Sequence, residues 1–368
     1  MATTLADASG TFEGIVGNAT VIRMLEKALA GGVAHAYIFH GPNGVGKRTV
    51  ARRFGAALVS GGDAASEDRA RRGLHPDLIE VIPEGAFTTI GQVRELLRVA
   101  ASRPFEGARR AFILQADSLN VQASNALLKT LESPEGETVF VLLAASREGV
   151  LPTVLSRSQP MRFNSVPLDE VARFLDERGV AEPELAAALG RGSVGLALRY
   201  ANEVELKELR EVAFGAAFGV GGDYEERHEA VVGIVGRAEA VGAAREAAVL
   251  GEVEAPDRRV KDRAKRVGRA ARDAAVGEAL DLISLAYRDA AMVAVGAEDL
   301  AANVDKLEDI RARVDEWPDA DWAGAAASVG EARAALTYNV SSEAILEVAL
   351  SQTRQRILGH SRARSYPG

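Results

Sequence analysis

A glycine-rich loop carries the clearest chemical signal in the sequence. It reads Gly-Pro-Asn-Gly-Val-Gly-Lys over residues 41–47, follows a short apolar segment and opens a helical pattern. Glycines let backbone N–H groups curl around phosphate oxygens, the helix start adds a positive dipole end, and the lysine supplies a point charge. These features predict a P-loop. The predicted nucleotide-binding residues in it are Gly41, Asn43, Gly44, Val45, Gly46, Lys47, Arg48 and Thr49.

The same loop departs from a hydrolytic site. Arg48 stands where a metal-binding P-loop has Ser or Thr, and Thr49 lies one residue further, rotated by about 100° around the helix. The carboxylates that bind Mg²⁺ and activate water usually end a strand, but segment 111–114 is followed by Gln115, and the first acid is Asp117. We therefore expect ATP or ADP as the cofactor, bound through the backbone, with Mg²⁺ binding impaired.

Short apolar runs alternate with helical patterns over the first 165 residues. Strands are predicted at 36–39, 78–82, 111–114, 139–144 and 161–163, and helices at 20–30, 47–58, 92–102 and 121–132. Strands of nearly continuous apolar character are typical of a parallel sheet that is buried on both faces. The alternation predicts a doubly wound α/β domain with helices flanking the sheet.

Strand signals vanish after Pro167. Helices are predicted at 169–178, 183–189 and 194–202, and longer ones include 276–295 and 342–358, whereas the tail 360–368 has no periodicity and is expected to fray. The simplest division is a small helical domain followed by a larger helical domain from about residue 203.

Composition excludes several classes of protein. The 368 residues contain no cysteine, which rules out disulfides and thiolate zinc sites, and no run approaches the roughly 18 apolar residues of a membrane helix. The N-terminus lacks a signal-peptide pattern, so we expect a soluble cytoplasmic protein that contacts no membrane. The net charge of −8 argues against nucleic-acid binding by bulk electrostatics.

One segment is strongly basic although the chain as a whole is acidic. Residues 258–272, from Arg258 to Arg272, hold eight Lys or Arg and one Asp, just after the acidic stretch 252–257. A solvated helix face opposite local acids is favoured over a nucleic-acid contact, and the sequence leaves open whether this segment meets DNA or another subunit.

A ten-residue segment identifies a family resemblance. Residues 125–134 read Asn-Ala-Leu-Leu-Lys-Thr-Leu-Glu-Ser-Pro, which resembles the NALLKTLEEP signature of bacterial clamp-loader AAA+ subunits. Further matching segments are Ile15-Val16-Gly17, residues 35–39, Gly73-Leu74-His75-Pro76-Asp77-Leu78, residues 151–159, Arg288-Asp289 and Tyr338-Asn339-Val340. The resemblance implies an α/β AAA+ P-loop domain over residues 1–165, a helical lid domain over 166–203 and an all-α collar domain over 204–368.

Set against the motor subunits of this family, the chain lacks several hydrolytic elements. Their Asp-Glu pair falls on Leu114-Gln115, their sensor Thr-Thr pair on Ala145-Ser146, and their second sensor arginine on Gly195. Together with Arg48, these differences imply that the chain does not turn over ATP by itself.

One catalytic element of the family remains. Ser156-Arg157-Ser158 is similar to the family's Ser-Arg-Cys motif, whose arginine projects into a neighbouring subunit's nucleotide site. Without the resemblance, a local ion pair of Arg157 with a carboxylate would be the favoured interpretation. The resemblance adds Val16 and Gly17 to the nucleotide-binding residues. Family members usually carry a four-cysteine zinc module in the interval 59–72, which is cysteine-free here, so no zinc is expected.

The resemblance implies a stator subunit of a clamp loader that acts in DNA replication. Its implied partners are gamma/tau-type motor subunits and a delta subunit in a hetero-pentamer, and, through that complex, the sliding clamp and primer-template DNA. Two alternatives stay open: an active ATPase motor using Lys47 and Asp117, and a scaffold in which the nucleotide is structural and Arg157 is idle. The occupancy of the P-loop and the number of motor copies are not determined by the sequence.

Overall fold

The computed structural model describes residues 10–81, 88–132, 137–219, 221–251, 253, 255, 257–337 and 340–363. The chain forms two compact units, Met1–Leu198 and Arg199–Gly368. Their boundary falls inside helix α9 (Val194–Asn202), so the predicted division into three domains stays a prediction. Several predicted features lie outside the described residues: Ser133-Pro134 of the signature, Tyr338-Asn339, residue 82 of the second strand and the end of the tail, 364–368.

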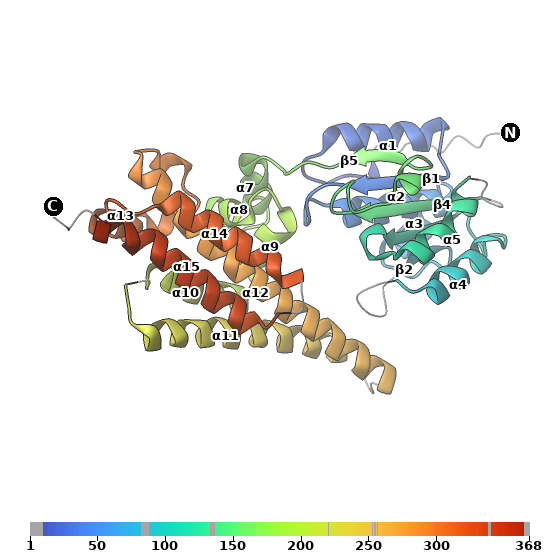
Figure 1. Ribbon diagram of the computed structural model, residues 1–368. Helices are drawn as coiled ribbons and strands as arrows, with labels where there is room; N and C mark the ends of the chain where they lie inside the picture. The colour runs from blue at the N-terminus through green and yellow to red at the C-terminus, as the bar shows by residue number, and fades with distance from the viewer. Residues whose placement is uncertain are drawn as a thin grey trace. The chain divides into compact units, whose positions relative to one another are not determined.

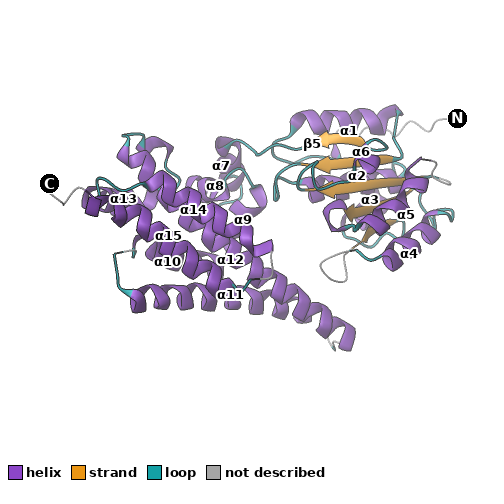
Figure 2. Ribbon diagram, viewed as in Figure 1, coloured by secondary structure: helices purple, strands orange, loops and turns teal. Residues whose placement is uncertain are grey.

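The first unit is built on a parallel five-stranded sheet (Figures 1 and 2). Its spatial order is β2 (Leu78–Val81), β3 (Arg110–Gln115), β4 (Thr138–Ala144), β1 (Ala36–His40), β5 (Gln159–Arg162). Every neighbouring pair in this order is parallel. The α/β prediction and all five predicted strands are confirmed, to within one or two residues at most ends.

Helices cover both faces of this sheet because strand side chains alternate between two cores. Tyr37 and Phe39 of β1 pack with helices α1 and α2 on one face, whereas Ile38, between them, packs with α4, α5 and α6 on the other. The helix bounds are α1 Ala19–Gly31, α2 Lys47–Ser60, α3 Ala64–Arg71, α4 Ile90–Ala100, α5 Val121–Glu132, α6 Pro152–Leu155, α7 Leu168–Asp176 and α8 Pro183–Gly190. The sequence analysis did not predict helix α3, because its residues are small or polar and show no apolar periodicity.

A buried ion pair anchors the turn into β2. The carboxylate of Asp77 is fully buried and accepts hydrogen bonds from the backbone N–H groups of Phe105, Glu106 and Gly107. The guanidinium of Arg110 lies 3.0 Å from it. Burial alone would raise the pKa of Asp77, but these hydrogen bonds outweigh burial and lower it. The backbone N–H of Asp77 also bonds to the His75 ring, so the predicted His-Pro-Asp turn is confirmed.

Among the described residues, the second unit is entirely helical. After α9 come α10 Val204–Phe218, α11 Tyr224–Gly251, α12 Arg258–Ala294, α13 Leu307–Glu316, α14 Trp322–Ala334 and α15 Ser342–Ala363, with short 3₁₀ turns at Glu298–Leu300, Val304–Lys306 and Ala335–Thr337. Its core includes Tyr287, Trp322 and Leu346, which are nearly or fully buried.

One sequence-based boundary in this unit differs from the structure. The apolar pattern placed a helix at 276–295, whereas α12 begins at Arg258 and joins the basic segment to that pattern in one helix. Ala264 and Gly268 are buried in its first half, and Gly268 lies close to Gly242 of α11. Helix α15 continues to Ala363, and the fraying expected from residue 360 stays a prediction.

Candidate functional site

The P-loop lies between β1 and α2 at the carboxyl ends of the strands. Gly46 precedes the helix with φ +98°, a conformation that a side chain disfavours, and α2 starts at Lys47. The Lys47 ammonium is buried and donates hydrogen bonds to the backbone oxygens of Gly41 and Pro42, 2.5 and 2.6 Å away. Burial lowers the pKa of Lys47, and the Asp117 carboxylate partly offsets that effect. The loop therefore has the lysine and the helix start that phosphate binding requires.

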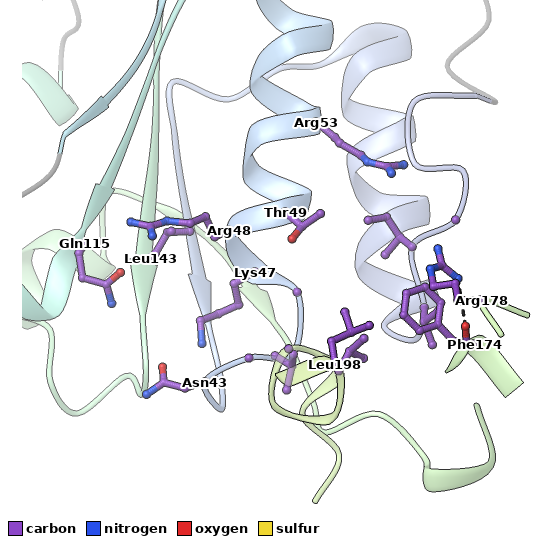
Figure 3. A pocket seen from close by; sticks show the side chains of 18 residues that line it. Asn43, Lys47, Arg48, Thr49, Arg53, Gln115, Leu143, Phe174, Arg178 and Leu198 are labelled. Atoms are coloured by element: carbon purple, nitrogen blue, oxygen red, sulfur yellow. Dashed lines mark hydrogen bonds between the residues drawn. The ribbon is translucent and has the colours of Figure 1, made fainter. Parts of the chain in front are cut away.

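A cavity of about 520 Å³ opens at this loop (Figure 3). Its lining comprises Gly14, Ile15, Val16, Asn43, Gly44, Val45, Gly46, Lys47, Arg48, Thr49, Arg53, Gln115, Leu143, Phe174, Arg178, Val194, Gly195 and Leu198. In Figure 3, Gln115 and Leu143 lie at one end and Phe174 and Arg178 at the other, with Lys47 between them. Four lining residues are cations and none is a carboxylate. Such a lining fits an anionic phosphate chain and offers no carboxylate ligand for Mg²⁺.

Arg48 occupies the sequence position of the metal-binding Ser or Thr, but its side chain forms an ion pair with Glu80. Its guanidinium pairs with Glu80 of β2 at 2.6 Å, and Arg52, one turn along α2, pairs with the same carboxylate at 2.5 Å. This pairing joins the P-loop helix to the edge strand of the sheet. The arginine at this position therefore supports the structure and cannot replace a serine or threonine as a metal ligand.

The end of β3 lacks the acid that hydrolysis requires. Leu114 is buried in the core, and Gln115 occupies the cavity wall. Asp117 lies in the 3₁₀ turn Ala116–Ser118, where its carboxylate accepts a hydrogen bond from the backbone N–H of Ala145 at 2.6 Å and from the Gln115 amide at 3.2 Å. Asp117 is not among the cavity-lining residues. Its hydrogen bond from Ala145 joins the turn after β3 to the segment after β4.

The start of α9 packs directly on the P-loop. The backbone N–H of Gly195 donates to the Gly44 oxygen at 3.0 Å, and a side chain at Gly44 would begin 1.9 Å from the Ser193 hydroxyl. Ser193 itself caps α9 by accepting from the Leu196 N–H at 3.1 Å. Gly195, the position that corresponds to a sensor arginine, thus makes a close backbone contact with the loop and carries no charge toward the cavity.

The other predicted nucleotide-binding residues are only partly brought together. Val16 lines the cavity, whereas Gly17 does not and instead approaches Val166, and Gly41 lines a neighbouring hollow. Sequence reasoning missed several cavity residues, among them Arg53, Phe174 and Arg178. The guanidinium of Arg178 lies 3.5 Å from the centre of the Phe174 ring, and its spacing of four residues from that ring on one helical turn was the available signal.

Arg157 lies outside this cavity, in the turn after α6. Its Nε donates to Glu132 of α5 at 2.7 Å, and its Nη1 donates to the Thr153 backbone oxygen at 2.9 Å. The side chain is 31% exposed and that of Glu132 is 51% exposed, so water and any approaching protein can reach the pair. Arg157 does not line its own chain's cavity, and a role in phosphate chemistry would require another chain.

Two further sequence-based points concern metal and membrane. The interval predicted to lack zinc forms the end of α2 and helix α3, and the described residues contain no cluster of three metal-ligating side chains; the absence of zinc stays a prediction. None of the described helices has the length and apolarity to span a bilayer.

Similarity to known proteins points to one family. A family model described as DNA polymerase III, delta subunit, matches residues 17–167. Over residues 17–167 the chain is therefore similar to subunits of DNA polymerase III. The chain is 37% identical over 173 residues to DNA polymerase III subunit delta' of Pseudomonas aeruginosa (43% of this chain, 53% of the relative). It is 29% identical over 188 residues to subunit delta' of Bacillus subtilis (48% and 57%).

Relatives named as tau or gamma subunits of DNA polymerase III also match. Subunit tau/gamma of Haemophilus influenzae is 33% identical over 170 residues, 44% of this chain and 24% of the relative. A solved gamma subunit-related protein of Thermotoga maritima aligns with a TM-score of 0.46 and 18% identity, over 92% of this chain and 99% of that one. The chain spans about half the length of the two delta' relatives. The residues that the family model matches, 17–167, lie in the unit Met1–Leu198.

Proposed function

We propose that the chain is the stator-type, delta prime-like subunit of a clamp loader, which presents Arg157 to the nucleotide of a neighbouring ATPase subunit and does not hydrolyse ATP alone. The observation that carries the proposal is the cavity lining, with four cations and no carboxylate. Without a carboxylate to bind Mg²⁺ or activate water, this site can hold phosphate but lacks the groups for phosphoryl transfer.

The position of Arg157 supports the second half of the proposal. An exposed guanidinium held by one exposed carboxylate can exchange that partner for phosphate at little cost, because surface ion pairs contribute about 0–1 kcal/mol. An arginine supplied in trans stabilises the charge that develops in phosphoryl transfer and is worth about 10³–10⁵ in rate in other ATPases and GTPases. If a nucleotide binds this chain, the backbone of residues 43–49 and Lys47 would hold its phosphates.

The implied assembly has gamma/tau-type motors, a delta subunit, the sliding clamp and primer-template DNA as its other members. The similarity to both delta' and tau/gamma relatives supports membership of such a complex. The active-motor alternative relies on Asp117, and that carboxylate is occupied by Ala145 and Gln115. The scaffold alternative keeps nucleotide binding and gives Arg157 no role.

The test is the clamp- and DNA-stimulated ATPase rate of a reconstituted loader that contains this chain, beside the rate of the chain alone. We expect the chain alone to be silent, and Arg157→Ala to lower the rate of the complex at least about tenfold. Arg173→Ala is the matched control, since Arg173 is an exposed arginine that forms an ion pair in the same unit.

Each other outcome selects an alternative. Hydrolysis by the isolated chain that Lys47→Ala abolishes would make it a motor. Normal activity of the Arg157→Ala complex, with nucleotide bound at the P-loop, would make it a scaffold.

A further inference from the structure

We infer that the first half of α12 is a binding surface for the phosphate backbone of duplex DNA. This surface, called here the basic face, consists of Arg258, Lys261, Arg263, Lys265, Arg266, Arg269 and Arg272. It lies in the unit Arg199–Gly368 and shares no residue with the P-loop cavity or with Arg157.

The charges of the basic face are largely uncompensated within the chain. Arg258 reaches Asp262 only at 3.9 Å, and Arg272 pairs with its neighbour Asp273 at 2.8 Å. The other five cations are exposed and have no ion pair with any described residue. Whether the acids of the stretch 252–257 face this segment stays a prediction, because residues 252, 254 and 256 lie outside the described part of the chain. Uncompensated cations on an acidic protein indicate an anionic ligand.

The helix holds these cations in a fixed arrangement. Asp257 caps its start by accepting from the Val260 N–H at 2.8 Å, and the helix continues without a break for 37 residues. Gly242 of α11 and Gly268 of α12 let the two backbones approach closely, since an added Cβ at Gly242 would lie 2.8 Å from the Gly268 oxygen. Figure 1 shows α11 and α12 side by side along this stretch. Arg272 lies at this contact too, because an added Cβ at Gly242 would lie 3.1 Å from its Cβ, and it is half-buried. The exposed cations of the basic face are Arg258, Lys261, Arg263, Lys265, Arg266 and Arg269.

The shape and composition of the surface favour duplex DNA. From Arg258 to Arg272 the helix rises about 21 Å, the length of about six base-pair steps at 3.4 Å per phosphate. Residues 257–273 contain no aromatic residue. Proteins that bind single-stranded nucleic acid rely on aromatic side chains that stack on the bases. Protein–protein interfaces rely on aromatic or apolar anchor residues. No large hydrophobic side chain is exposed in the described part of α12. With single-stranded nucleic acid and a protein partner disfavoured, we infer that the basic face contacts the phosphates of duplex DNA and does not read its bases.

The test is a salt titration of the full chain with a fluorescent 20-base-pair duplex, followed by anisotropy. We expect affinity in the range of about 10⁻⁴–10⁻⁶ M near physiological salt, independent of sequence. The triple variant Lys261→Ala, Lys265→Ala, Arg269→Ala should bind at least about tenfold more weakly at 50 mM salt, and the slope of log K against log salt should fall by about 2–3.

Two control variants show whether a loss of binding comes from this surface, from the change in net charge or from misfolding. Arg237→Ala, Arg311→Ala, Arg313→Ala makes the same charge change at exposed, paired positions of the same unit and should bind as the wild type. Lys261→Arg with Lys265→Arg should retain binding. Alanine favours helix, so unchanged helical circular dichroism is expected throughout.

Absence of duplex binding by the wild type at 50 mM salt, or equal binding by the alanine triple variant, would overturn the inference. Tighter binding of a poly-glutamate peptide that duplex DNA does not displace would overturn it in favour of an acidic protein partner. Either failure leaves the ATPase experiment on Arg157 unaffected.

Discussion

Two arginine–carboxylate pairs in the unit Met1–Leu198 use the same chemical groups for different purposes. Arg110 and Asp77 are buried, with side chains 6% and 0% exposed, and three backbone N–H groups complete the site. Arg157 and Glu132 are 31% and 51% exposed, and among the described residues a backbone oxygen, that of Thr153, accepts a hydrogen bond from the arginine. A buried pair cannot change partners without leaving a charge out of water, whereas an exposed pair can. Burial therefore separates a structural arginine from one available to a partner.

The largest effect is expected from breaking the buried pair. Asp77→Asn should lower the free energy of unfolding by about 3–5 kcal/mol, because it leaves the Arg110 guanidinium buried without its counter-charge. Urea denaturation followed by circular dichroism measures this loss. A loss below about 1 kcal/mol would show that the turn into β2 does not depend on the pair.

A smaller effect is expected when the pH is lowered, because the contribution of the Asp77–Arg110 pair to the free energy of unfolding depends on pH. The pKa of Asp77 is lowered in the folded chain, so the folded state binds fewer protons at this carboxyl than the unfolded state does. Its contribution is present above the unfolded pKa of about 3.9 and is lost as pH falls through the lower folded value.

The difference in unfolding free energy between wild type and Asp77→Asn should thus be constant from about pH 5 to 7 and shrink below about pH 4. Exposed carboxyls such as Glu95 and Glu298, whose pKa values are also lowered by arginine partners, are common to both proteins and cancel. A difference that persists unchanged to pH 3 would contradict this assignment to Asp77.

The smallest effect is expected from the exposed pair. Glu132→Gln should change the free energy of unfolding by less than about 1 kcal/mol and leave the ATPase rate of the reconstituted complex within about twofold of wild type, because Arg157 keeps its charge and its Thr153 contact. The coupled ATPase assay and urea denaturation check both values. A tenfold fall in rate would mean that Glu132 positions Arg157 for its partner.

Much of the α/β unit could be predicted from local patterns. Nearly continuous apolar runs identified all five strands, and the glycine-rich loop predicted a helix start at Lys47, where α2 begins. The unexpected helix α3 and the early start of α12 share one cause. Both are rich in alanine and charged residues, so the large apolar side chains that reveal a helix period are few there.

The sequence by itself determined the order of strands and helices, the P-loop and the absence of acids at Leu114-Gln115, because these depend on residue type and near neighbours. Only the tertiary structure decided the partners of Arg48, Asp117 and Arg157, since these contacts join residues that are 25 to 32 positions apart in the sequence. It also decided that the cavity has four cations and no carboxylate, because distant helices and loops contribute its walls. Long-range packing, which no local pattern encodes, sets which charges meet.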